Sequence, residues 1–225
     1  MDAIIFDFDG VVVDSEPVHL KAFQQVLAGR GITLSRQEYY TRYLGLDDRD
    51  CFGLILHEHS IEADDEELAR LTAAKSSRVQ REFRRGIAAQ PGAVELIRQA
   101  ELDALPIAIC SGALREEILL AAAAIEVADS FMTIVSAEDV SQGKPSPEGF
   151  KLALSRLEQL SGRLLLADKT LVVEDAPPGI QAAKSLGMKV LAVTTSYDRL
   201  ALGQADWIID SLAEVTVADL EGRVD

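Results

Sequence analysis

The stretch AIIFDFDG, residues Ala3–Gly10, begins with an uninterrupted apolar run that stops at two closely spaced aspartates. Short runs of bulky residues without polar alternation are typical of strands buried on both faces of a parallel sheet. Five more such runs follow, at Ile107–Cys110, Met132–Val135, Leu171–Val173, Val190–Val193 and Trp207–Ile209. Amphipathic stretches predict helices between most of them, at Ala93–Leu102, Glu116–Ile125, Pro147–Gln159 and Ile180–Leu186. This alternation predicts an open α/β fold in which helices flank a parallel sheet.

One long segment breaks the alternation. From Pro17 to Arg85 the sequence contains only helical patterns, at Val18–Leu27, Arg36–Tyr43, Asp50–His57 and Glu66–Phe83. About seventy residues without a strand are too many for one crossover connection. They predict a helical domain at residues 16–87, inserted into an α/β core domain made of residues 1–15 and 88–225.

The composition is that of an ordinary globular protein and narrows the range of partners. The 225 residues are 48% hydrophobic, and 37 acidic against 22 basic residues leave a formal charge of −15. Such a field repels phosphate backbones and anionic lipid, so we expect no nucleic acid and no membrane partner. Two cysteines, Cys51 and Cys110, are too few for a disulfide framework. With no export signal in the sequence, they predict a cytoplasmic protein, and a monomer is the default expectation.

Polar residues follow four of the predicted strands. Asp7 and Asp9 follow the first, Ser111-Gly112 the second, Lys144 a loop after the third, and Glu174-Asp175 the fourth. In open α/β sheets, ligands bind outside the carboxyl ends of the strands. We therefore expect these side chains to converge on one edge of the sheet.

Carboxylates dominate this predicted cluster. Asp7 and Asp9 lie on the same side of an extended segment, which suits one as nucleophile or metal ligand and the other as general acid and base. The alternative is a pair of strand-end aspartates that cap a turn. Asp175 could likewise cap the next helix, or complete an oxygen-ligand site with Asp7 that would suit Mg²⁺.

Ser111 and Lys144 add groups that favour an anion. Ser111 could be a plain helix N-cap, yet the same geometry presents a hydroxyl and free backbone N–H groups to a phosphate. Lys144 stands between Gly143 and Pro145 in a loop that cannot be helical. A lysine restricted in this way could neutralise a phosphoryl group.

Taken together and in this order, these residues resemble the four motifs of the haloacid dehalogenase superfamily, in its phosphatase and phosphomutase branch. DFDGVVVDSEP, residues 7–17, is similar to the first motif and Ser111 to the second. Lys144 in GKPSPE is similar to the third, and Glu174-Asp175 to the fourth. The resemblance covers essentially the whole chain and implies a Rossmann-like core with a small helical cap. Two aspartates in the first motif favour phosphoryl transfer over dehalogenation.

The resemblance also implies roles. Mg²⁺ is expected on Asp7, the Asp9 carbonyl and Asp175, with help from Glu174. Asp7 is expected to attack phosphorus and form an aspartyl-phosphate, while Asp9 serves as acid and base. Ser111, with Gly112 beside it, and Lys144 are expected to bind the phosphoryl group. Cap closure is expected to exclude water, and the substrate would be a small phosphorylated metabolite.

The molecule that takes the phosphoryl group from the expected aspartyl-phosphate decides between two activities. Water would make a phosphatase, and a second sugar hydroxyl would make a phosphomutase of the β-phosphoglucomutase type. His19, Arg49 and Lys75 fall where such mutases carry a linker histidine and basic cap residues, and related phosphatases carry them too. The run Ala113-Leu114-Arg115 after Ser111 is less polar than expected for a mutase, so the phosphatase is preferred. A non-catalytic binding protein is the third reading, and the intact motifs oppose it.

Overall fold

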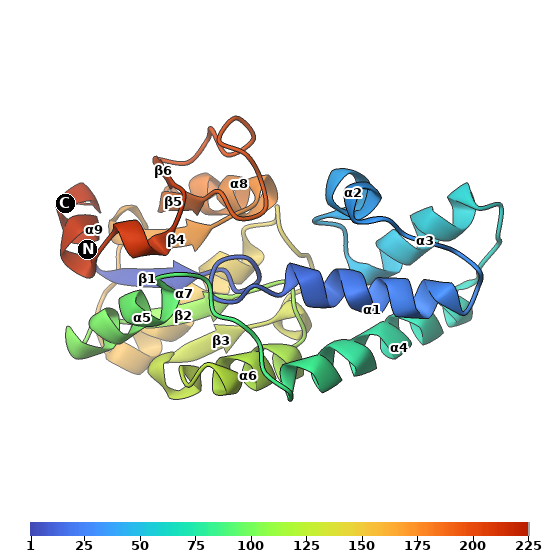
Figure 1. Ribbon diagram of the computed structural model, residues 1–225. Coiled ribbons are helices and arrows are strands. Elements are labelled where there is room, and N and C mark those ends of the chain that lie inside the picture. The colour runs from blue at the N-terminus through green and yellow to red at the C-terminus, as the bar shows by residue number, and fades with distance from the viewer. Residues whose placement is uncertain (225) are drawn as a thin grey trace. The chain divides into compact units, whose positions relative to one another are not determined.

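The computed structural model of the protein describes residues 1–224, which divide into two compact units (Figure 1). Met1–Asp14 and the chain from Gly86 onward form the first unit, and Ser15–Arg85 form the second. We call them the core unit and the helical unit. Within residues 1–224, no helix is both long enough and apolar enough to span a membrane.

The core unit is built on a parallel sheet. Its strands are β1 (Ala3–Phe6), β2 (Ile107–Cys110), β3 (Thr133–Val135), β4 (Thr170–Glu174), β5 (Lys189–Val193) and β6 (Trp207–Ile209). They lie in the order β3-β2-β1-β4-β5-β6, and each neighbouring pair is parallel. This confirms the predicted α/β fold. The chain builds outward from β1 to β3 on one side, then crosses to β4 on the other, so the strand order reverses at β1 and β4.

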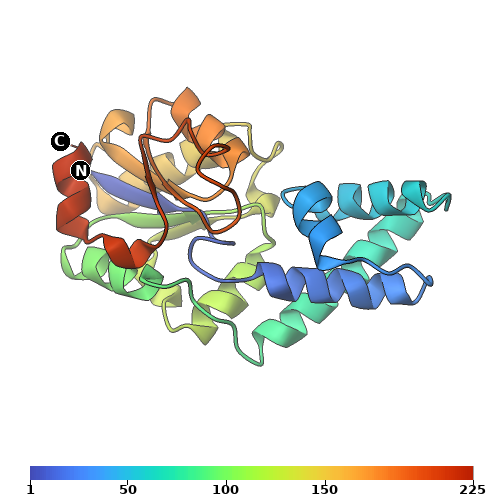
Figure 2. The same cartoon turned by 45° about the horizontal axis from the view of Figure 1, so that its top comes forward.

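Helices cover both faces of this sheet, as Figure 2 shows. They are α5 (Ala93–Leu102), α6 (Arg115–Ala124), α7 (Glu148–Ser161), α8 (Pro177–Ser185) and α9 (Val217–Val224). Short 3₁₀ turns occur at Ala128–Ser130, Ala137–Asp139, Ala167–Lys169 and Leu212–Glu214. Ala3 and Ile5 of β1 pack in one cluster with Phe150 of α7 and Ile180 of α8. Because side chains alternate along a strand, Ile4 and Phe6 face the opposite side, and Phe6 meets the ring of Phe131 there.

The helical unit contains α1 (Glu16–Ala28), α2 (Arg36–Glu38), α3 (Asp48–Glu58) and α4 (Asp65–Phe83). Aspartates begin two of these helices. Asp47 Oδ1 accepts from the N–H of Asp50, and Asp64 Oδ1 accepts from the N–H of Glu67, both at 2.8 Å. Such caps satisfy backbone donors that have no partner inside the helix. The apolar faces of the helices then meet in a core around Phe23 and Phe52.

The predicted helix at Arg36–Tyr43 is present, but its second half is π-helical. Only Arg36–Glu38 are α-helical, and Tyr39–Tyr43 form a π-helical turn closed by the N–H of Leu44 on the carbonyl of Tyr39. The wider turn brings both end tyrosines into the core. There Tyr39 donates to Glu16 at 2.7 Å and Tyr43 donates to Glu58 at 2.6 Å. These buried hydroxyls are thus paired with carboxylates that are distant in sequence.

Candidate active site

Asp7 is the first residue after β1, and the sheet determines its placement. Its backbone N–H donates to the carbonyl of Val173 on β4 at 2.9 Å, so the ladder continues one residue past the strand. The carboxylate is buried, and its Oδ1 accepts from Nζ of Lys144 at 2.5 Å. Burial raises the pKa of Asp7 to about 7, although the nearby Lys144 ammonium lowers it. The site thus holds a carboxylate that is both buried and paired.

Glu174 ends β4, and its carboxylate is anchored at both oxygens. Oε1 accepts from Nζ of Lys144 at 2.6 Å, while Oε2 accepts from the backbone N–H groups of Asp175 and Ala176, each at 3.0 Å. The carboxylate lies directly against Gly179 of α8. A Cβ at residue 179 would come within 1.6 Å of Oε1, so only glycine leaves room for Glu174 in this position.

Asp175 lies against the turn that follows Asp9. A Cβ at Gly10 would come within 2.0 Å of Asp175 Oδ2, and Gly10 has a φ of +76°, so both space and backbone conformation require glycine there. Burial, together with the charges of Glu174 and Asp7, raises the pKa of Asp175 well above its usual range. Helix α8 begins at Pro177 with Ala176 as its N-cap residue, so Asp175 is not the helix cap.

The donor set of this cluster fits a hard divalent cation. Ligand oxygens of Asp7, Glu174 and Asp175 all lie within 4.8 Å of one another, and all three residues are buried. Three carboxylates face one ammonium, so the ionised cluster carries an uncompensated charge of about −2, which a divalent ion would neutralise. The predicted metal set also included Asp9, whose backbone carbonyl was the expected ligand. That contribution stays a prediction.

Asp9 and Ser111 join the same edge of the sheet. Ser111 Oγ lies 3.5 Å from Asp9 Oδ2, although the residues are far apart in sequence. The charge of Asp9 acts on Asp7 and raises its pKa, after the larger effects of burial, Lys144 and Glu174. Three other carboxylates and the Lys144 ammonium are therefore assembled near Asp7, and the Ser111 hydroxyl joins them through Asp9.

The alternative reading of Ser111, as the N-cap of the next helix, is wrong. Helix α6 begins at Arg115 after Leu114, and Ser111 Oγ instead accepts from the N–H of Ala113 at 3.0 Å. The N–H of Arg115 donates to Glu138 Oε2 at 2.7 Å, so a carboxylate from the next loop satisfies the helix start. A Cβ at Gly112 would meet nothing within 4 Å, which leaves open space beside Ser111.

Lys144 reaches the carboxylates from a loop held by the first turn of α7. Glu148 accepts from the N–H of Ser141 at 2.9 Å and from the N–H of Gln142 at 3.0 Å, which shapes the segment before the lysine. The Lys144 ammonium also lies 4.9 Å from the centre of the Phe150 ring. Burial lowers the pKa of Lys144, but the charges of Asp7 and Glu174 outweigh it, and the net pKa is raised well above its ordinary value.

Within the helical unit, two of the three predicted substrate residues meet. Lys75 Nζ lies 2.5 Å from His19 Nδ1, and its side chain is only 2% exposed. The same ammonium donates to Asp48 Oδ1 at 2.7 Å and lies 5.0 Å from the centre of the Phe23 ring. Asp48 was not singled out from the sequence. The charge of Lys75 is therefore offset by Asp48 within the helical unit.

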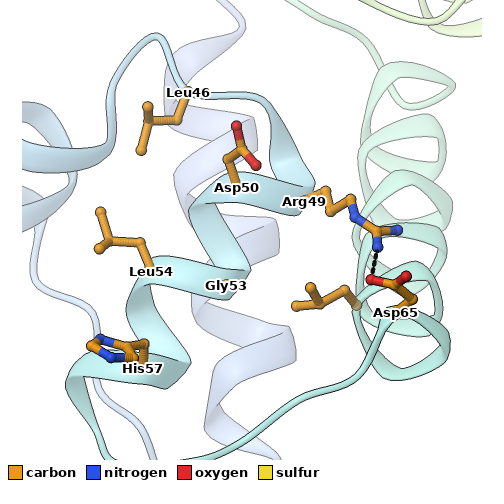
Figure 3. Close-up of a pocket in the computed structure, with 8 residues that line it drawn as sticks. Leu46, Arg49, Asp50, Gly53, Leu54, His57 and Asp65 are labelled. Carbon is orange, nitrogen blue, oxygen red and sulfur yellow. Dashed lines mark hydrogen bonds and ion pairs between the residues drawn. The ribbon is translucent and has the colours of Figure 1, made fainter.

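Arg49, the third predicted substrate residue, lies elsewhere on the helical unit. It lines an open depression of about 440 Å³ between α3 and the start of α4, and its guanidinium pairs with Asp65 (Figure 3). Leu46, Leu54 and Leu68 make the depression largely apolar. Neither His19 nor Lys75 lines it. The structure thus separates Arg49 from the other two candidates.

Two residues that the sequence reasoning missed contact the carboxylate cluster. Thr195 Oγ1 lies 3.2 Å from Asp175 Oδ2, and the Ser196 side chain also hydrogen-bonds to Asp175. Their only sequence signal was a run of hydroxyl residues after the fifth predicted strand, at the same edge as the motifs. Threonine and serine are common in loops, so this signal was weak on its own.

Known proteins resemble the chain over nearly its whole length. A sequence model of the family described as haloacid dehalogenase-like hydrolase matches residues 4–193. Protein CbbY of Rhodobacter capsulatus is 30% identical over 224 residues, covering 95% of this chain and 94% of the relative. The phosphorylated carbohydrates phosphatase of Thermotoga maritima is 26% identical over 189 residues, covering 84% of this chain and 83% of the relative.

Among solved structures, a mutant of CbbY from Rhodobacter sphaeroides in complex with xylulose-(1,5)bisphosphate has the same fold. Its TM-score is 0.87 at 24% identity, and the match covers 98% of this chain and 99% of that one. This likeness agrees with the α/β core and helical insertion described above.

Proposed function

The chain belongs to the haloacid dehalogenase-like hydrolase family, and on that premise we propose that this enzyme is a Mg²⁺-dependent phosphatase of a small phosphorylated metabolite. The observation that carries the proposal is the meeting of three buried carboxylates with the Lys144 ammonium at one point of the sheet edge. This donor set suits a divalent ion and a phosphoryl group together.

Asp7 is the proposed nucleophile. Asp7, Glu174 and Asp175 would hold Mg²⁺, whose charge would offset their repulsion and attract phosphoryl oxygens. A carboxylate oxygen of Asp7 attacks phosphorus while the bond from phosphorus to the ester oxygen breaks, giving an aspartyl-phosphate. Lys144 pairs with Asp7 before the reaction, and its ammonium lies within reach of the negative charge that spreads over the transferred group.

Asp9 is the proposed acid and base. Its carboxyl gives a proton to the departing ester oxygen, so the alcohol leaves neutral. The resulting carboxylate then takes a proton from water, whose oxygen attacks the aspartyl-phosphate. Phosphate is released, and Asp7 is restored. The Ser111 hydroxyl is the proposed donor to the phosphoryl group; its 3.5 Å contact with Asp9 Oδ2 and the space beside Gly112 support this role.

Hydrolysis is favoured over mutase chemistry because the basic side chains that could bind a second phosphate are already paired with carboxylates. Arg115, which follows the second motif, donates to Asp139 Oδ2 at 2.6 Å and to the Ile134 carbonyl at 2.9 Å. A mutase must also bind a second phosphate on the sugar. The cations considered for that role, Lys75 and Arg49, are paired with Asp48 and Asp65.

The proposed substrate is a monophosphate of a sugar or polyol. Curated relatives include the hexitol phosphatase A of Escherichia coli and the phosphorylated carbohydrates phosphatase of Thermotoga maritima. His19, Lys75 and Arg49 remain the proposed substrate residues of the helical unit. Because Asp48 pairs with Lys75, the His19–Lys75 pair suits substrate hydroxyls better than a second phosphate. A cytoplasmic site of action belongs to the same proposal, since Cys51 and Cys110 are free, buried thiols.

A phosphate-release screen tests the proposal. Sugar phosphates, polyol phosphates, phosphoglycolate and xylulose 1,5-bisphosphate are each assayed with Mg²⁺ and with a chelator. We expect Mg²⁺-dependent phosphate release, with a monophosphate preferred over the bisphosphate by about tenfold in kcat/KM. The β-glucose 1-phosphate reaction is also assayed for glucose 6-phosphate. Glucose 6-phosphate with little free phosphate would establish the mutase instead, and a preference for the bisphosphate would refute the monophosphate assignment.

A further inference from the structure

Three hydroxyl residues, Thr194, Thr195 and Ser196, directly follow β5. Strand β5 pairs with β4, and Ala192 lies opposite Glu174. The turn after β5 therefore starts beside the two acidic residues that end β4. None of the four sequence motifs includes these hydroxyls, yet two of them contact the carboxylate cluster.

Thr195 connects two segments that the motifs supply separately. Its Oγ1 lies 2.6 Å from the Gly10 carbonyl oxygen and 3.2 Å from Asp175 Oδ2. Ser196 adds a hydrogen bond to Asp175, and its Oγ would lie 2.9 Å from a Cβ at Gly10. The Asp9–Gly10 turn, the Asp175 carboxylate and the two hydroxyls are thus in mutual contact.

The hydroxyls of Thr195 and Ser196 have different hydrogen-bond partners. A threonine hydroxyl has one proton, and the shorter contact assigns it to the Gly10 carbonyl. On its other side, Gly10 donates its N–H to the Val13 carbonyl at 2.9 Å. Residue Gly10 is therefore held at both its N–H and its carbonyl, and Ser196 holds Asp175 against it.

We propose that Thr195 and Ser196 are positioning residues for a divalent cation: Thr195 holds the Gly10 carbonyl, and with it the turn after Asp9, while Ser196 holds the Asp175 carboxylate against that turn. The inference rests on the Mg²⁺ site of the proposed function. Thr195 acts through the turn at Gly10, against which Asp175 lies. Partners of this kind orient metal ligands, and removing one weakens metal binding by about 10- to 100-fold.

The test is a titration with Mg²⁺ alone, without substrate, followed by calorimetry and by the metal-dependent rise in Tm. Thr195→Val keeps the side-chain shape and removes the hydroxyl, and we expect at least about tenfold weaker Mg²⁺ binding. Thr195→Ser restores the hydroxyl and should bind Mg²⁺ within about twofold of the wild type. The activity of Thr195→Val should recover at high Mg²⁺, with kcat less affected than the half-saturating Mg²⁺ concentration.

Thr194→Val is the matched control in the same turn. Its Oγ1 donates to Asp210 Oδ1 at 2.9 Å, so the substitution disturbs the turn without removing a contact to the cluster. We expect unchanged Mg²⁺ affinity. Should Thr195→Val fail to fold, Thr195→Ala and Ser196→Ala carry the same test.

Three results would overturn the inference while leaving the proposed function standing. They are wild-type affinity in folded Thr195→Val, an equal loss in Thr195→Ser, and an equal loss in Thr194→Val. A folded wild-type protein that binds no Mg²⁺ would instead refute the proposed function, and the inference with it.

Discussion

Replacing Asp175 by asparagine should stabilise the metal-free protein while removing its response to Mg²⁺. Asp175 faces two carboxylates, and the ligand oxygens of all three lie within 4.8 Å of one another. At an effective dielectric constant of about 20, two like charges 4.8 Å apart repel by about 3.5 kcal/mol. The Lys144 ammonium offsets roughly one of the two repulsions, and partial protonation of the cluster relieves more. We therefore expect a net gain of about 2 kcal/mol in the free energy of unfolding.

For a chain of this length, about 2 kcal/mol corresponds to a rise in Tm of roughly 4–8 °C. Thermal unfolding is followed by circular dichroism at pH 7.5, in a chelator and in excess Mg²⁺. The wild type should gain about 2.7 kcal/mol at a Mg²⁺ concentration one hundred times its Kd, whereas Asp175→Asn should gain almost nothing. The difference between the two Tm values should then shrink or change sign when Mg²⁺ is added.

Asp103→Asn is the matched control, because Asp103 is exposed at the end of α5. The change in its free energy of unfolding should stay within about 0.5 kcal/mol, and its response to Mg²⁺ should equal that of the wild type. The reasoning is refuted if Asp175→Asn has the same Tm as the wild type, or a lower one, in chelator. Retention of the full Mg²⁺ response by Asp175→Asn would refute the metal assignment.

Three further predictions concern the nucleophile, the glycine beneath Glu174 and a surface ion cluster. Asp7→Asn should lower turnover by about three orders of magnitude or more with an unchanged circular dichroism spectrum, because an amide cannot attack phosphorus; near-normal Mg²⁺-dependent activity would contradict this. Gly179→Ala should abolish the Mg²⁺-dependent rise in Tm, since its Cβ would come within 1.6 Å of Glu174 Oε1. Its control, Gly53→Ala in α3, meets its nearest atom only at 3.9 Å and should keep that rise. Burial raises the pKa of Asp139, but hydrogen bonds from Arg156, Ser136 and Arg115 outweigh it, and the net pKa lies below its usual range. A carboxyl whose pKa is lower in the folded state stabilises the fold at pH values above its pKa in the unfolded state, and this stabilisation is lost in acid. Asp139→Asn should therefore lower the free energy of unfolding by about 2 kcal/mol at pH 7. That difference from the wild type should shrink as the pH falls below about 4, and a difference independent of pH would contradict the assignment.

The sheet could be predicted closely because burial on both faces leaves a simple signal. The runs at Ala3–Phe6, Ile107–Cys110 and Trp207–Ile209 coincide with β1, β2 and β6. The ends of these strands are marked by abrupt changes from apolar to polar residues or turn residues. Helices α1 and α3 to α8 were predicted to within a few residues, since their apolar faces repeat at the helical period, whereas α9 (Val217–Val224) was not predicted.

What the sequence could not predict depends on partners that are distant in the chain. The tyrosines of the π-helical turn at Tyr39–Tyr43 donate to Glu16 and Glu58, and the first N–H of α6 donates to Glu138. In the site, the order of the motifs at strand ends was enough to place Asp7 beside Lys144 and Glu174. No local pattern indicated that Asp48 would neutralise Lys75.

The three carboxylates are held by three different kinds of donor, and this difference bears on how the site works. Asp7 has the Lys144 ammonium, and Glu174 has the same ammonium and two backbone N–H groups. Asp175 has the Ser196 hydroxyl, and the Thr195 hydroxyl lies 3.2 Å away. A neutral hydroxyl offsets a buried charge less than an ammonium does. Asp175 is therefore the carboxyl whose ionised form is offset the least in the metal-free site, in keeping with its raised pKa, and a bound cation would stabilise that ionised form the most.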